Sequence, residues 1–222
     1  MQFNEINGRF KDAPWYTAST KETILVVGMG GISSNTMYCL SKTIPAKYFL
    51  VDADIVNEYN VGTQFFTKSQ IGKPKIEAII ETLTPQSLAT FIPLNKMFSN
   101  EYRPITITGL DNMSTRKQVY EEWKKHEDRE LLIDGRLRAS LYEIYVVTPD
   151  KEAEYEKTLF NDSVIDEGPC TFKQTSYFGM LIGARITHIL VNYLTNKYMG
   201  EEVCNVPFKV SEIGEPFIFE SI

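Results

Sequence analysis

The chain has few cysteines and histidines, and this scarcity limits the kinds of site it can form. Its 222 residues include three cysteines, Cys39, Cys170 and Cys204, and two histidines. The cysteines are far apart and form no C-x-x-C pair, so the sequence encodes neither a disulfide framework nor a four-cysteine zinc site. We therefore expect no zinc and a reducing compartment.

Clusters of positive charge and long apolar runs are also missing. The net charge is −6, from 23 Lys and Arg against 29 Asp and Glu, and the basic residues are scattered. An acidic chain without a basic cluster is a poor match for nucleic acid or an anionic membrane. The first 22 residues are polar, and the longest apolar stretch near the C-terminus is interrupted by Arg185 and His188. We expect a cytoplasmic protein that binds neither nucleic acid nor membrane.

Strand-like and helix-like patterns alternate along the chain. The expected strands are 24–27, 48–51, 89–93, 105–110, 131–134, 141–147, 207–213 and 216–220, and the expected helices are about 32–42, 74–83, 112–125 and 177–198. Such alternation is typical of crossovers between parallel strands. The fold class is therefore α/β and Rossmann-like, with a mainly parallel sheet, helices on both faces and an antiparallel C-terminal extension.

The composition is that of one folded domain. Apolar residues make up 43% of the chain and charged residues 23%, which is ordinary globular usage. We expect a single domain over 1–222, with a nucleotide-binding half at about 22–125 and a C-terminal half at about 126–222. The second half would contain a long crossover loop at 160–175 before the last helix.

The stretch G-M-G-G-I-S-S at 28–34 joins the first expected strand to the first expected helix. Glycines here allow a tight turn and let a phosphate approach the helix N-terminus. Asp52 ends the second expected strand, where a carboxylate can accept hydrogen bonds from ribose hydroxyls. The pair predicts a nucleotide site; the alternative is a turn that needs glycine only for packing. Ser33 replaces the third glycine of a dinucleotide motif, which counts against tight binding of NAD.

Charged residues further along extend this candidate site. Asp54 lies two residues after Asp52, so on extended backbone both side chains point to the same side. Lys73 and Lys75 flank the proline that begins a helix, where cations are disfavoured and anions are favoured. They are therefore candidate anion-binding groups, the alternative being ordinary surface lysines.

Asp111 ends a further expected strand, and Arg116 follows one turn into the next helix. Ligands of open α/β sheets bind at the carboxyl ends of the strands, so Asp111 should share an edge with Gly28 and Asp52. A carboxylate beside a triphosphate is best explained as a magnesium ligand. The alternative is a helix cap without a chemical role.

Five motifs in this order resemble the ThiF/MoeB family, the adenylation fold of ubiquitin-activating-type enzymes. They are G-M-G-G-I-S-S, V-D-A-D-I-V, Y-N-V-G-T-Q-F, G-K-P-K-I-E-A and G-L-D-N-M-S-T-R, and the resemblance runs from about Glu22 to Arg116, more weakly to Leu194. It implies one adenylation domain that binds MgATP and joins the C-terminal carboxylate of a ubiquitin-like, sulfur-carrier or peptide substrate to the α-phosphate. It also implies a homodimer. The stretches L-I-D-G-R at 132–136 and G-P-C-T at 168–171 resemble the small bacterial and phage-encoded members.

The resemblance also assigns roles to individual residues. The phosphate-side loop would be Gly28, Gly30 and Gly31, the ribose ligand Asp52, and the residues lining the phosphates Asn60, Gln64 and Lys75, with Asp54 beside them. Asp111 would organise magnesium and the attacking carboxylate, with Lys75 and Arg116 as further catalytic candidates. Both reactants are anions, so catalysis would consist of neutralising and aligning them.

Two features leave the activity open. Thr63 stands where the family typically has arginine, and losing one such contact costs on the order of 10²–10³ in rate. Arg9, Arg116 and Arg136 are candidates to replace it. Cys170 precedes a helix, where a lowered pKa would make it a thioester-forming nucleophile, or it is a small packing residue.

Two alternative functions remain. One is a degenerate family member that binds nucleotide or protein without turnover, which Ser33 and Thr63 favour. The other is an NAD-dependent oxidoreductase, which accounts for Gly28 and Asp52 but not for Lys75 or Asp111.

Overall fold

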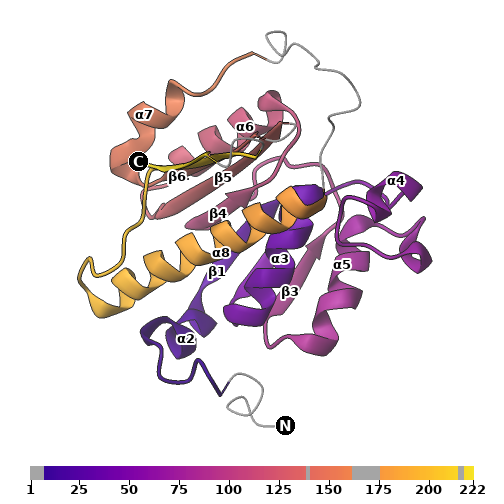
Figure 1. The fold of residues 1–222 in the computed structure, drawn as a ribbon, viewed down its shortest axis with the longest axis horizontal. Helices are drawn as coiled ribbons and strands as arrows, with labels where there is room; N and C mark the ends of the chain where they lie inside the picture. The colour runs from indigo at the N-terminus through magenta and orange to yellow at the C-terminus, as the bar shows by residue number, and fades with distance from the viewer. Residues whose placement is uncertain (1–7, 139–140, 162–175, 215–217) are drawn as a thin grey trace.

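The protein is described by a computed structural model that covers residues 8–138, 141–161, 176–214 and 218–222. Within these ranges the strands form one sheet in the order β3-β2-β1-β4-β5-β6-β7-β8 (Figure 1). Their bounds are β1 Thr23–Val27, β2 Lys47–Val51, β3 Thr90–Leu94, β4 Ile105–Thr108, β5 Leu131–Arg138, β6 Leu141–Val147, β7 Lys209–Ile213 and β8 Ile218–Ser221. The first five are parallel and the last three antiparallel, which confirms the predicted sheet.

Several strand bounds differ from the sequence prediction, and β7 begins at Lys209 and not at 207. β4 ends at Thr108 and not at 110, and β5 continues to Arg138 and not only to 134. The extension of β5 follows from its antiparallel pairing with β6, which runs from Leu132↔Val147 to Arg138↔Leu141. This second part of β5 carries arginines at 136 and 138, so no apolar pattern marked it as strand. Residues 162–175, most of the predicted crossover loop, lie outside the described residues.

The four predicted helices are present, and the described part of the chain contains three shorter helices that were not predicted. The helices are α2 Pro14–Ala18, α3 Gly31–Thr43, α4 Glu58–Val61, α5 Lys75–Leu83, α6 Met113–Lys124, α7 Glu152–Glu156 and α8 Ser176–Met199, with 3-10 turns η1 Ser19–Lys21, η2 Lys68–Gln70, η3 Thr84–Gln86 and η4 Pro149–Lys151. α2, α4 and α7 have at most five residues, too few to show a helical period in sequence. None of the helices that the structure describes is long and apolar enough to cross a membrane.

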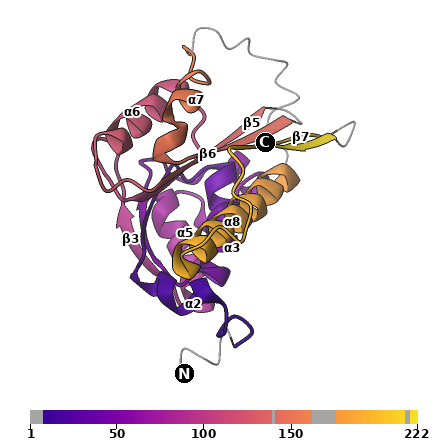
Figure 2. The ribbon, with the colours of Figure 1, turned by 90° about the vertical axis from the view of Figure 1, so that its left-hand side faces the viewer.

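Helices cover both faces of the sheet. On β1, Ile24 and Val26 pack in the core shared with α3, α5 and α8, whereas Leu25 and Val27 pack in the core shared with α6 and α7. Figure 2 shows the two layers on opposite sides of the strands. All four β1 side chains are buried because parallel strands in the middle of a sheet are covered from both sides.

The backbones of α3 and α8 come so close where the helices cross that no side chain fits between them. A Cβ atom on Gly179 would lie 2.7 Å from the carbonyl oxygen of Gly31, and one on Gly183 would lie 2.8 Å from the backbone nitrogen of Thr36. Backbone cannot yield as a flexible side chain can, so glycine is required at both positions. The first of these contacts fixes α8 directly against the first turn of α3.

We predict that Gly183→Ala destabilises the protein by about 1–3 kcal/mol, because the added methyl overpacks a helix crossing. The control is Gly62→Ala, since a Cβ at Gly62 meets nothing within 4 Å and φ is −80°. Urea unfolding of both variants measures the difference. Equal stabilities of the two variants would contradict the requirement for glycine at the crossing of α3 and α8.

Candidate nucleotide-binding site

The predicted site residues gather along one edge of the sheet. β1, β2 and β4 are parallel neighbours, so their carboxyl ends lie together. Gly28 follows β1, Asp52 follows β2, and Asp111 lies three residues after β4. This edge is where open α/β sheets bind ligands.

The turn after β1 requires glycine at its first position. Gly28 has φ +82°, its N–H donates to Val51 O at 2.9 Å, and a Cβ there would lie 3.1 Å from Gly109 O. Gly30 is different, because it precedes α3 with φ −82° and a Cβ there would meet nothing within 4 Å. The space above Gly30 is thus free for a ligand.

The N-terminus of α3 faces this free space. The N–H groups of Gly31, Ile32 and Ser33 are the first of the helix, and groups in this position have no acceptor within their own helix. Together with the helix dipole they favour an anion. The geometry therefore fits a phosphate group.

Asp52 fixes the turn by accepting two backbone hydrogen bonds. Its Oδ2 accepts from Met29 N at 2.5 Å and its Oδ1 from Asp54 N at 2.7 Å. A carboxylate has about four acceptor positions, so about two remain for ribose hydroxyls. Asp52 thus connects the ends of β1 and β2 and still has capacity for a ligand.

The two candidate lysines have different environments. Lys75, on the first turn of α5, has an 8% exposed side chain, and its Nζ lies 2.8 Å from Oδ2 of Asp54, which is 66% exposed. The backbone N–H of Lys75 also donates to Asp54 O at 2.9 Å. Lys73 is 44% exposed and pairs with Glu81 at 2.6 Å. Only Lys75 is held next to the Asp52 turn.

Asn60 and Gln64 lie on a short helix and loop that α3 holds in place. Phe65 N donates to Ser34 Oγ at 3.0 Å, which ties this loop to the first turn of α3. Asn60 Oδ1 accepts from Asn57 N at 2.8 Å, so Asn60 stabilises α4. The Oε1 atom of Gln64 is buried without a hydrogen-bond partner among the described residues, so it is an unsatisfied acceptor.

Asp111 is exposed at the edge. Its Oδ1 accepts a hydrogen bond from Asn112 Nδ2 at 3.2 Å, and Asn112 in turn caps α6 by accepting from Thr115 N at 2.8 Å. The described residues contain no group of three or more carboxylate, histidine or cysteine side chains able to hold a metal. One carboxylate is nevertheless compatible with magnesium when phosphates supply further ligands.

Arg116 lies behind the edge and not on it. Its side chain is buried and forms an ion pair with Asp134. Nη2 donates to Leu110 O at 2.5 Å, and Nη1 donates to Gly135 O at 3.3 Å. The structure therefore connects this catalytic candidate to the backbone just before Asp111 and not to open space.

Asp134 is the centre of a buried network that the residue pattern did not reveal. Oδ1 accepts from Thr108 Oγ1 at 2.9 Å, and Oδ2 accepts from Arg136 Nε at 2.8 Å and from Tyr155 OH at 3.0 Å. Burial raises the pKa of Tyr155, which keeps its hydroxyl protonated as a donor. A carboxylate within the apolar strand sequence L-L-I-D-G was the available signal, since buried charges require partners.

None of the three arginines expected to substitute for an arginine at position 63 is placed over the candidate site. Arg116 and Arg136 are engaged by Asp134, and Arg9 is exposed in the segment before α2. Thr63 itself, which follows α4, donates a hydrogen bond to Tyr59 O at 3.2 Å.

The cysteines that the structure describes are Cys39 and Cys204, and both are free thiols. Cys170, the candidate nucleophile, lies outside the described residues. Cys39 is within α3, and burial raises the pKa of its thiol, which disfavours the reactive thiolate.

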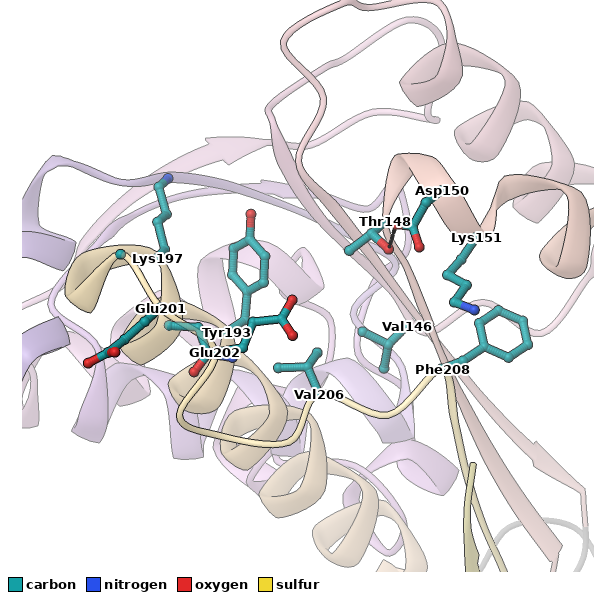
Figure 3. Close-up of a pocket in the computed structure, with 12 residues that line it drawn as sticks. Val146, Thr148, Asp150, Lys151, Tyr193, Lys197, Glu201, Glu202, Val206 and Phe208 are labelled. Carbon is teal, nitrogen blue, oxygen red and sulfur yellow. Dashed lines mark hydrogen bonds between the residues drawn. The ribbon is translucent and has the colours of Figure 1, made fainter.

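A cavity of about 570 Å³ lies at the opposite edge of the sheet (Figure 3). It is lined by Val146 and Thr148 at the end of β6 and by Tyr193 and Lys197 on α8. Val147 pairs with Leu132, near the amino end of β5. The cavity is therefore separate from the candidate nucleotide-binding site, which lies at the carboxyl ends of β1, β2 and β4.

The sequence profile of the ThiF family matches residues 12–212. The chain belongs to the ThiF family. Among curated proteins, it is 36% identical over 101 residues to ubiquitin-like modifier-activating enzyme 5 of Drosophila willistoni, a match covering 45% of this chain and 23% of that protein. The chain thus spans about a quarter of the length of this relative.

Solved structures of other proteins share the ThiF-type fold. PaaA superposes with a TM-score of 0.74 at 13% identity, covering 94% of this chain and 66% of that one. MccB of E. coli superposes with a TM-score of 0.75 at 13% identity, covering 100% of this chain and 70% of that one. At these identities the likeness establishes the fold alone.

We predict that Arg116→Met costs this ThiF-family chain about 3–5 kcal/mol of stability, because the change removes one partner of a buried charge. Lys124→Met is the control: it removes an exposed cation from the same helix and from its pair with Glu156, and should have a much smaller effect. Urea unfolding at pH 7 compares them. A similar midpoint for both variants would contradict the structural role of the Arg116–Asp134 pair.

Proposed function

We propose that the chain is an ATP-dependent adenylyltransferase that activates the C-terminal carboxylate of a ubiquitin-like, sulfur-carrier or peptide substrate as an acyl-adenylate. The observation that carries the proposal is the gathering of the open α3 N-terminus, Asp52 and Lys75 at one sheet edge. Similarity to a ubiquitin-like modifier-activating enzyme supports it, as does the fold likeness to MccB, whose structures include one with ATP and one with N-formylated MccA.

Each residue has a definite task in this proposal. The first N–H groups of α3 bind phosphate oxygens, and Asp52 accepts hydrogen bonds from the ribose. Lys75 exchanges Asp54 for a phosphate, and Gln64 Oε1 accepts a further hydrogen bond from the ligand. Asp111 would hold magnesium, which would neutralise phosphate charge. The substrate carboxylate then attacks the α-phosphate, and pyrophosphate leaves.

Arg116 takes a supporting task in the same proposal. By holding the carbonyl of Leu110 it fixes the backbone from which Asp111 projects. It is therefore a positioning residue. Cys170 stays a candidate acceptor of the activated carboxylate.

A nucleotide-binding member without turnover is the second candidate. It is favoured by Thr63, whose hydroxyl donates to Tyr59 O in α4, and by the engagement of Arg116 and Arg136 with Asp134. ATP–pyrophosphate exchange separates the two functions. Exchange with a partner ending in Gly-Gly supports the enzyme, whereas magnesium-independent ATP binding without exchange supports the second candidate, and tighter binding of NAD than of ATP supports an oxidoreductase.

The remaining partner predictions are part of the same proposal. We propose one adenylation domain over 1–222 that acts as a homodimer in the cytoplasm, because the resemblance implies this assembly. Sedimentation velocity at micromolar concentration tests the dimer, and a monomer at all concentrations would contradict it.

We predict that Lys75→Met lowers the rate of ATP–pyrophosphate exchange by about 10²–10³, the usual loss for one charge-stabilising contact. Lys73→Met is the matched control, because Lys73 is exposed and pairs with Glu81, and should retain the rate within about twofold. Asp111→Ala should abolish exchange. If Lys73→Met and Lys75→Met were equally impaired, Lys75 would have no special role.

We also predict that Gly30→Ala weakens ATP binding about tenfold, or about 1.4 kcal/mol, by occupying ligand space. Because a Cβ at this position meets nothing in the protein, the thermal unfolding midpoint without nucleotide should not change. Isothermal titration calorimetry and a thermal melt provide the two readings. Unaltered ATP affinity would exclude Gly30 from the phosphate site.

A further inference from the structure

The outer edge of β8 is open in the described part of the chain. β8 pairs with β7 and is the last strand of the sheet, and all four of its residues are exposed. An exposed edge strand presents unpaired N–H and C=O groups to which another strand can bind.

The ladder identifies which backbone groups face outward. Lys209 and Ile222 exchange two hydrogen bonds of 2.9 Å, so they form a hydrogen-bonded pair between the strands. In antiparallel pairing such pairs alternate with non-hydrogen-bonded ones. Glu220 and Ile218 therefore face β7, and the N–H and C=O groups of Phe219 and Ser221 face outward.

Side chains near this edge add apolar contact area on both faces. Ile213 and Ile218 are paired on one face and are 41% and 47% exposed. Phe219, on the other face, is 46% exposed and lies beneath the guanidinium of Arg185 from α8, whose Cζ is 4.6 Å from the ring centre. Glu220 has no ion-pair partner among the described residues.

The edge suits a single extended segment better than a second copy of the chain. Stable dimers bury about 20–30 residues on each side, far more than β8 offers. Symmetric pairing of β8 with β8 through the outward groups of Phe219 and Ser221 would set Glu220 directly opposite Glu220 of the second copy. Like charges in that position are destabilising.

A strand added antiparallel to β8 would run toward the candidate nucleotide-binding site. β7 runs toward the edge that carries Gly28 and Asp111, because Ile213 pairs with Leu141 and Leu141 with Arg138 at the end of β5. β8 runs away from that edge, so an antiparallel partner runs toward it. The order β4-β5-β6-β7-β8 puts such a strand five spacings from β4, about 24 Å, which about seven extended residues cross.

We propose that β8 binds an extended segment of the acyl substrate as a ninth strand, about seven residues before the free carboxylate. The segment carries a basic residue opposite Glu220, followed by apolar residues opposite Phe219 and Ile218. This inference rests on the proposed function for the identity of the partner. It gives the substrate a docking site separate from the reacting carboxylate.

Proline and alanine at position 221 isolate the outward backbone group. Ser221→Pro removes the outward N–H but no ladder bond to β7, and proline is tolerated on such edges. Ser221→Ala is the matched control, because it changes the side chain and keeps the N–H. Phe219→Pro is a second variant with the same logic, and circular dichroism checks that each variant is folded.

The probe is a fluorescent peptide with the strand sequence Val-Lys-Val-Val, a glycine–serine tail of two, seven or twelve residues and a free carboxylate. In fluorescence anisotropy, Ser221→Pro should raise the Kd at least about tenfold, and Ser221→Ala should not change it. Glu220→Lys should weaken binding about twofold to fivefold and favour the peptide in which Glu replaces Lys. Amide hydrogen exchange at Phe219 and Ser221 should slow in the wild-type complex.

Pyrophosphate exchange with the same peptides keeps the two proposals distinguishable. Exchange should be fastest with the seven-residue tail and negligible with the two-residue tail. Equal binding to wild type and Ser221→Pro, or no binding to either, overturns the docking site even if exchange occurs. Edge-dependent binding without exchange for any tail supports the docking site and overturns the adenylyltransferase.

Discussion

The carboxylate of Asp134 is fully buried, and the arrangement of four elements depends on it. Two arginines, Arg116 from α6 and Arg136 from β5, neutralise it, while Thr108 of β4 and Tyr155 of α7 donate further hydrogen bonds. Burying an ion costs several kcal/mol unless its partners compensate, so these groups must be in place together. The backbone that leads to Asp111 is thereby attached to the most tightly specified part of the core.

The sheet and its main helices could be predicted from sequence because each signal was local. The period of α8, the apolar run of β1 and the glycine turn at Gly28 all lie within short windows, and the structure places them as expected. Because β1, β2 and β4 are parallel, their carboxyl ends lie at the same edge of the sheet. This is why Asp52 and Asp111 could be assigned to one edge before their surroundings were known.

The environment of each charged residue could not be predicted in the same way. Lys75 is buried beside Asp54 whereas Lys73 is exposed beside Glu81, and Arg116 is paired in the core with Asp134, which lies eighteen residues later in the chain. Such pairings join residues that are far apart in the sequence, so no local pattern predicts them. The open edge of β8 likewise follows from its place at the end of the sheet and not from its composition.

α8 runs from the carboxyl ends of the parallel strands to their amino ends. At its beginning Gly179 packs against Gly31 in the first turn of α3, and near its end Lys197 pairs with Glu22 and Glu130 beside the cavity of Figure 3. Twenty-four helical residues span about 36 Å. The glycine crossing holds α8 against the first turn of α3, and the far end of the same helix lines the cavity. A single helix therefore packs against the candidate site at one end and forms part of the cavity wall at the other.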